Sequence, residues 1–91
     1  MEFEWGETKA RANRAKHGID FAVAVEIFDD PDCLLRLDPR SYGEERYRAI
    51  GLVEGRMLQV VFTMRSGVCR IISARRAGRR ERTNYSLQAG R

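Results

Sequence analysis

The sequence predicts an α+β domain, in which two N-terminal helices pack on a four-stranded antiparallel meander sheet and a basic helix follows. Ninety-one residues, 43% hydrophobic and 33% charged, suit a single domain over residues 1–91. Apolar residues recur at helical spacing before Pro31 and alternate with polar residues after it. Glycine-containing connections of two or three residues separate the later segments, which is typical of antiparallel hairpins.

The N-terminal part predicts a short strand and two helices. Residues 3–5 alternate apolar and acidic side chains, as a strand does. Residues 7–17 form the first expected helix, and Gly18 ends it because glycine readily adopts the left-handed conformation found there. Asp20 is a suitable N-cap for the second helix, which Pro31 ends.

The second expected helix carries one apolar stripe. Its members fall at positions i, i+3, i+4 and i+7 of one helix face: Phe21, Ala24, Val25 and Phe28. Such a stripe belongs to the core rather than to a cofactor site. We expect it to pack on one face of a later strand, formed by Leu58, Val60, Phe62 and Met64.

Four strands and a last helix are expected after Pro31. The strands are residues 33–37, 46–53, 57–64 and 68–74, with a polar loop at 38–43. The last helix runs from about residue 79 to 87 and has just two clearly apolar residues, Tyr85 and Leu87. Because these can bury little surface, we expect this helix to be loosely docked or completed by a partner.

Charge is unevenly distributed along the chain. The net charge of +4 comes from 17 basic and 13 acidic residues. Residues 1–45 hold 6 basic and 11 acidic side chains, whereas residues 46–91 hold 2 acidic side chains and 11 basic ones, all arginine. Arginine binds phosphate through a planar fork, so the second half predicts a surface for a polyanion, most simply nucleic acid. The alternative is that the arginines occupy solvated strand faces.

Other classes of protein have little support. The longest apolar run, residues 21–25, is too short to cross a bilayer, and the first residues lack the pattern of a signal peptide. Cys33 and Cys69 are too few for a disulfide framework, so we expect reduced thiols in a cytoplasmic protein. One histidine and two separated cysteines give no metal-ligand spacing. We therefore expect no metal site and no cofactor.

The first expected helix carries both lysines of the chain and its single histidine. Lys9, Asn13 and Lys16 fall at i, i+4 and i+7, and His17 follows Asn13 by four residues. This arrangement predicts a polar face with two cations and an imidazole, the side chain that most readily exchanges a proton near neutral pH. The alternative is a solvated face on which His17 stabilises the helix C-terminus.

A second constellation lies at residues 44–48, where the loop enters a strand. Alternate residues of a strand point to opposite faces, so Glu45 and Tyr47 share one face while Arg46 and Arg48 share the other. A carboxylate beside arginines suits a general base held near a phosphate. A surface ion pair would have the same spacing, so the pattern does not choose between them.

The clearest signal is residues 75–82, which contain five arginines: Arg75, Arg76, Arg79, Arg80 and Arg82. The segment joins the end of the last strand to the start of the last helix. Helix N-termini attract anions through their free N–H groups, and arginines there add to the attraction. The segment therefore predicts a phosphate site.

Several segments of this chain resemble the BrnT family. They are residues 3–5, 9–18, 21–31, 45–51 and 71–82, which together cover nearly the whole chain in the right order. The elements Lys-His-Gly at 16–18 and Ile-Ser-Ala-Arg-Arg-Ala at 72–77 make the match strong in combination. One departure is Gly6, where the family usually has an acidic residue.

The resemblance implies a type II toxin, a ribonuclease with a RelE-like fold that arrests translation. It also implies a BrnA-type antitoxin, whose ribbon-helix-helix domain binds the promoter of the operon. Contact with promoter DNA would then run only through the antitoxin, and no membrane partner is expected.

We therefore expect a metal-independent RNA endonuclease in which the RNA 2′-hydroxyl attacks the adjacent phosphate. Glu45 or His17 would transfer the proton, and Arg75 would stabilise the charge that develops on the phosphate. The expected phosphate-binding residues are Lys9, Lys16, Arg46, Arg48, Arg76, Arg79, Arg80 and Arg82. Two alternatives remain: a module that binds RNA or DNA without cleaving it, and an interaction protein whose last helix needs a partner.

Overall fold

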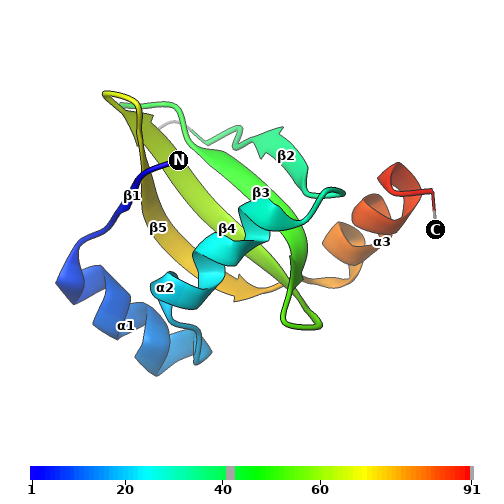
Figure 1. The fold of residues 1–91 in the computed structure, drawn as a ribbon, viewed down its shortest axis with the longest axis horizontal. Helices are drawn as coiled ribbons and strands as arrows, with labels where there is room; N and C mark the ends of the chain where they lie inside the picture. The colour runs from blue at the N-terminus through cyan, green and yellow to red at the C-terminus, as the bar shows by residue number, and fades with distance from the viewer. Residues whose placement is uncertain (41–42, 91) are drawn as a thin grey trace.

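The computed structural model describes residues 1–40 and 43–90, so Ser41 and Tyr42 of the expected 38–43 loop lie outside the described residues. The fold is α+β, as predicted (Figure 1). Its elements are β1 (Phe3–Glu4), α1 (Glu7–His17), α2 (Phe21–Ala24), the 3₁₀ helix η1 (Val25–Asp29), β2 (Leu34–Leu37), β3 (Tyr47–Val53), β4 (Arg56–Arg65), β5 (Val68–Arg76) and α3 (Arg79–Gln88).

The sheet has five strands, in the order β1-β5-β4-β3-β2. Strands β2 to β5 form the expected antiparallel meander. The prediction of four strands, all antiparallel, is wrong because β1 adds a fifth strand that pairs in parallel with β5. The long stretch of chain between β1 and β5 makes this possible, since parallel pairing needs a crossover that a hairpin turn cannot supply.

The second expected helix changes its geometry after one turn. It is α-helical over α2 and continues as the 3₁₀ helix η1. A 3₁₀ helix has three residues per turn, so Ile27 follows Ala24 on the buried side. Val25 and Phe28 are only half-buried. The predicted stripe is therefore right for Phe21 and Ala24 and misses Ile27.

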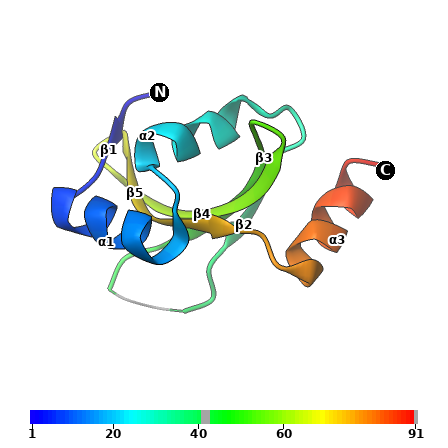
Figure 2. The ribbon, with the colours of Figure 1, turned by 90° about the horizontal axis from the view of Figure 1, so that it is seen from below.

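The main core lies between one face of the sheet and the helical segment α2–η1, which runs over that face (Figure 2). Phe28 of η1 stacks on Phe3 and meets the ring of Phe62 edge-on, with 5.1 Å between the ring centroids of Phe28 and Phe62. Leu58 and Val60 of β4 are fully buried here, as predicted. Met64 is instead 45% exposed, because it lies one residue before the end of β4.

Helix α1 is fastened to β5 by Asn13. The Asn13 amide donates to the carbonyl oxygens of Ile19 (3.1 Å) and Ala74 (2.9 Å) and accepts from the N–H of Ala74 (3.0 Å). The side chain therefore satisfies backbone groups of β5 that would otherwise need another strand. Placing Asn13 on an open polar face with Lys9 and Lys16 was wrong, because it is buried whereas both lysines are exposed.

Helix α3 is anchored more firmly than its composition suggests. Tyr85 is 2% exposed and belongs to a small second cluster with Leu34 and Ile50. Its hydroxyl donates to Oδ2 of Asp30 at 2.7 Å. The expectation of a loosely docked helix is therefore wrong for Tyr85. Leu87, by contrast, is 73% exposed.

The two cysteines are unpaired, as expected. Cys69 is buried and Cys33 half-buried, and burial raises the pKa of each thiol to about 11, with the charge of Asp30 contributing at Cys33. Among residues 1–40 and 43–90, no helix combines the length and apolar content needed to cross a membrane.

Candidate nucleic-acid interface

The sheet face opposite α2 carries arginines from three strands. Cross-strand partners in an antiparallel sheet point to the same side. Arg36 of β2 pairs with Arg48 of β3, and on β5 Arg70 and Arg75 pair with polar residues of β4. We call this the arginine face, defined by Arg36, Arg48, Arg70 and Arg75.

A β-bulge in β5 places Arg75 on the arginine face. Residues 61–62 of β4 are consecutive, yet they pair with Ser73 and Ile71, which leaves Ile72 as an extra residue in β5. With strict alternation Arg75 would share the face of Ile71 and point toward the core. The extra residue reverses the alternation, which is a recognised way in which bulges redirect a side chain beside a functional site.

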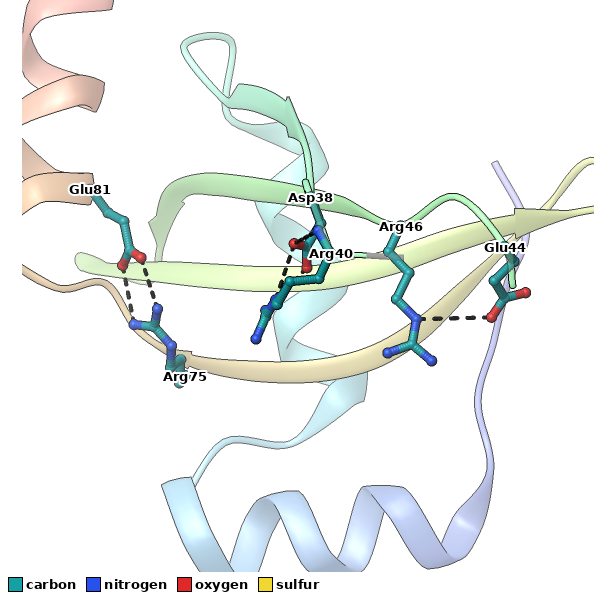
Figure 3. A network of polar contacts seen from close by, with 6 residues as sticks. All are labelled: Asp38, Arg40, Glu44, Arg46, Arg75 and Glu81. Atoms are coloured by element: carbon teal, nitrogen blue, oxygen red, sulfur yellow. Dashed lines mark hydrogen bonds and ion pairs between the residues drawn. The ribbon is translucent and has the colours of Figure 1, made fainter. Parts of the chain in front are cut away.

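Arg75 is held in one orientation by Glu81 of α3 (Figure 3). Its Nη1 and Nη2 atoms donate to the two Glu81 carboxylate oxygens at 3.1 and 2.8 Å. Gly78 N–H donates to the same carboxylate at 2.7 Å, and the Gln59 amide can donate to it at 2.7 Å while accepting from Arg75. Burial alone would raise the pKa of Glu81, but the hydrogen bonds from Arg75 and Gly78 and the charges of Arg75 and Arg48 hold it below its usual value.

A hollow of about 410 Å³ opens beside this pair, between the arginine face and α3. We call it the central hollow, and it is lined by Arg36, Leu37, Pro39, Arg48, Ile50, Arg80, Glu81 and Asn84. Three of these residues are arginines and one is a carboxylate that is already bound to Arg75. The central hollow can therefore accept a negatively charged group.

Arg48 is the most exceptional group in the central hollow. Its Nε atom is buried and has no hydrogen-bond partner within the part of the chain that the structure describes. The hydrogen bond from Arg40 is the main cause that lowers the pKa of Asp38, and the charge of Arg48 adds to it. A buried donor without an acceptor costs about 1–3 kcal/mol, so a phosphate oxygen at this position would be stabilising.

The predicted phosphate-binding residues divide into paired and unpaired cations. Arg46 lies 3.9 Å from a Glu44 carboxylate oxygen. Figure 3 shows this pair at the end of the sheet away from Arg75 and Glu81. Of the predicted phosphate-binding residues, those that form no ion pair within residues 1–40 and 43–90 are Lys9, Lys16, Arg48, Arg76, Arg79, Arg80 and Arg82. Four of these, residues 76–82, follow Arg75 directly at the end of β5 and in α3.

Glu45 lies far from Arg75. It is exposed just before β3, where its carboxylate accepts from the Tyr47 hydroxyl at 3.2 Å and its carbonyl oxygen accepts from Thr63 at 2.7 Å. Arg75 pairs with Gln59, which comes four residues before Thr63 in β4. Four residues of a strand span about 13 Å, so the two side chains belong to opposite ends of the sheet.

His17 lies on α1, the helix that packs against β5, and Arg75 lies near the end of β5. His17 is the last residue of α1 and is half-buried. The Asn13 amide joins Ile19, two residues after His17, to Ala74, the neighbour of Arg75. The fold therefore brings the end of α1 to the end of β5 where residues 75–82, which we call the arginine segment, begin.

Sequence reasoning missed three residues of the interface. Arg36 lies in the first half of the chain, which has a net negative charge, so the charge distribution along the sequence did not point to it. Glu81 is the third residue after Gly78, the position from which an acidic side chain caps a helix N-terminus. Its capping role could therefore have been predicted from the local sequence. Gln59 was also visible, as a polar residue inside an otherwise apolar strand.

Metal-ligating residues do not gather here. Among the residues that the structure describes, no three histidine, cysteine, aspartate or glutamate side chains lie close enough together to hold a metal ion.

A family model described as the ribonuclease toxin BrnT of a type II toxin–antitoxin system matches residues 5–81. No curated protein matches the chain.

Proposed function

The chain belongs to the BrnT family of ribonuclease toxins of type II toxin–antitoxin systems, and on this premise we propose that it is a metal-independent RNA endonuclease with its active site at the central hollow. Family membership implies an RNA target and an antitoxin partner. The observation that carries the site assignment is the buried Nε of Arg48, which has no hydrogen-bond partner among the described residues. Arg36 and Arg80 line the same hollow, and so does Glu81, which holds Arg75.

The proposed reaction uses the RNA itself as the nucleophile. The 2′-oxygen bonds to the adjacent phosphorus while the bond from phosphorus to the 5′-oxygen breaks. One group takes the 2′-hydroxyl proton, and another supplies a proton to the 5′-oxygen. Arg75 stabilises the added negative charge, because oriented donors in a partly desolvated site act more strongly than solvated ones.

Proton transfer is the role we propose for His17. The end of α1 lies at the same end of β5 as Arg75, whereas Glu45 lies at the opposite end of the sheet. An imidazole suits this task because it can accept and release a proton near neutral pH.

The product ends of cleaved RNA test this mechanism. We expect cleavage to continue in a chelator and to leave a 2′,3′-cyclic phosphate and a free 5′-hydroxyl. An RNA with a 2′-deoxy nucleotide at the cut site should resist, because its nucleophile is missing. Chelator-sensitive cleavage that leaves a 3′-hydroxyl would contradict the mechanism. Salt-dependent binding without cleavage would favour the alternative of a non-catalytic RNA-binding module.

We also propose that a BrnA-like ribbon-helix-helix antitoxin covers the arginine segment and α3, so that promoter DNA meets only the antitoxin. The outward side of α3 forms a hollow lined by Arg79, Arg82, Thr83, Ser86 and Leu87. Leu87 is 73% exposed there and shares the hollow with Arg79 and Arg82, which form no ion pair within the described residues. An antitoxin segment with acidic and apolar side chains would complement this surface and block access to the RNA site in the cytoplasm.

Leu87→Asp tests this partner surface. We expect at least a tenfold loss of antitoxin affinity in calorimetry, because burying one leucine contributes about 1.5–3 kcal/mol and a tenfold change is about 1.4 kcal/mol. RNA cleavage by the free variant should not change. Leu35→Asp, at a residue of β2 that is 57% exposed, is the control. Equal antitoxin affinities for the two variants would contradict this surface.

A further inference from the structure

A further hollow lies where the turn between β3 and β4 meets the end of β5 and the helix α3. We call it the turn hollow, of about 180 Å³, lined by Leu52, Gly55, Arg56, Met57, Arg76, Ala77 and Arg82. Arg56 begins β4, Arg76 ends β5 and Arg82 belongs to α3. Three elements that are separate in the sequence thus each contribute one arginine to the same small hollow.

The described part of the chain supplies no counter-charge to these three cations. None of the described residues that line the turn hollow is acidic. Within residues 1–40 and 43–90, no ion pair involves Arg56, Arg76 or Arg82. Like charges around a common space repel one another. A bound anion would remove this repulsion, and arginine is the side chain best shaped to bind phosphate.

The surroundings of the turn hollow set a direction for a bound polyanion. Leu52 also lines a neighbouring hollow, whose other residues include the four carboxylates of Glu26, Asp29, Asp30 and Glu54. These would repel a phosphate on that side. On the other side, Ala77 and the first turn of α3 lead to Arg80 in the central hollow. A polyanion can therefore extend between the two hollows and not beyond Leu52.

We propose that the turn hollow is a second phosphate site, which binds the backbone of the RNA strand outside the cleaved linkage. This inference rests on the proposed function, because it takes the ligand of the central hollow to be RNA. One strand then spans both hollows across residues 77–80. The turn hollow adds affinity for longer RNA and takes no part in the chemistry.

Arg56→Ala and Arg65→Ala form a matched pair of variants. The two arginines are the first and last residues of β4, so they lie about 30 Å apart. Each variant removes one positive charge from the same strand, and charges this far apart are screened from each other at ordinary salt. Binding is measured with 2′-deoxy-blocked RNA of three and twelve nucleotides, at 50 and 200 mM salt.

We expect Arg56→Ala to weaken binding of the twelve-nucleotide RNA and to leave binding of the three-nucleotide RNA unchanged. Loss of one phosphate contact lowers the salt slope by about 0.7, so the defect should be about 2.6-fold larger at 50 mM than at 200 mM. Arg65→Ala should bind both RNAs like the unaltered protein. Identical behaviour of the two variants, or an equal loss for both RNA lengths, would overturn the proposal. Failure of the proposed function would appear separately, as unaltered protein that binds RNA without cleaving it.

Discussion

Arg75→Ala is expected to slow RNA cleavage by about 10²–10³-fold, the effect of removing one oriented donor from a charge-stabilising site. The residue is suited to this role because the bulge at Ile72 directs it onto the arginine face and Glu81 fixes its guanidinium. A fixed donor needs no reorganisation when negative charge develops on the phosphate. Single-turnover cleavage of a short RNA measures the rate of the chemical step.

The fold should survive this substitution. Arg75 and Glu81 are 38% and 18% exposed, and partly solvated ion pairs contribute at most about 1 kcal/mol. Because the pKa of Glu81 lies below its usual value, the pair is intact at neutral pH and is lost only as the pH falls through that lowered pKa. Urea unfolding at neutral pH should therefore show a small loss of stability beside a large loss of rate.

Arg70→Ala is the matched control for Arg75→Ala. Arg70 lies on the same strand and the same arginine face, and it also pairs with a carboxylate, at 3.0 Å from Glu4. We expect its removal to change the cleavage rate by only a few fold. Equal rates for the two variants would show that Arg75 contributes charge to the surface but does not act on the reacting phosphate.

Local sequence patterns predicted most of the elements correctly. The first helix has the predicted bounds, because Gly18 adopts φ 71° and ends it. The expected split of residues 44–48 also holds, since Tyr47 stacks on Phe62 in the core while Arg48 faces Arg36. These features depend on one residue or on alternation within one strand.

Long-range pairing could not be predicted in the same way. The parallel partner of β1, the role of Asn13 and the burial of Tyr85 each depend on residues more than fifty positions away in the sequence. The bulge at Ile72 could not be predicted either, because it is defined by the register between β5 and β4. Strict alternation within β5 alone would direct Arg75 toward the core. The arginine segment was thus visible in the sequence, but its division between the two hollows was not.

His17→Ala is expected to lower the cleavage rate by about 10²–10⁴-fold and to change the pH profile, if the imidazole transfers a proton during the reaction. The fold brings the end of α1 to the end of β5 that carries Arg75, which is the geometric reason for this expectation. Glu45→Gln tests the other candidate. The Glu45 carboxylate is bound to the Tyr47 hydroxyl at the opposite end of the sheet, so this variant should cleave RNA within a few fold of the unaltered protein.

Stability distinguishes catalysis by His17 from a purely structural role. A cationic side chain in the last turn of a helix contributes about 0.3–1 kcal/mol through the helix dipole. If His17 served only that purpose, His17→Ala would lower the free energy of unfolding by this amount and leave the rate unchanged. His17→Gln retains hydrogen-bonding capacity, but an amide does not exchange a proton near neutral pH. This variant should therefore be as inactive as His17→Ala. A full rate in His17→Gln, with a deficient Glu45→Gln, would transfer the role to Glu45 and place the cleaved linkage near Arg46.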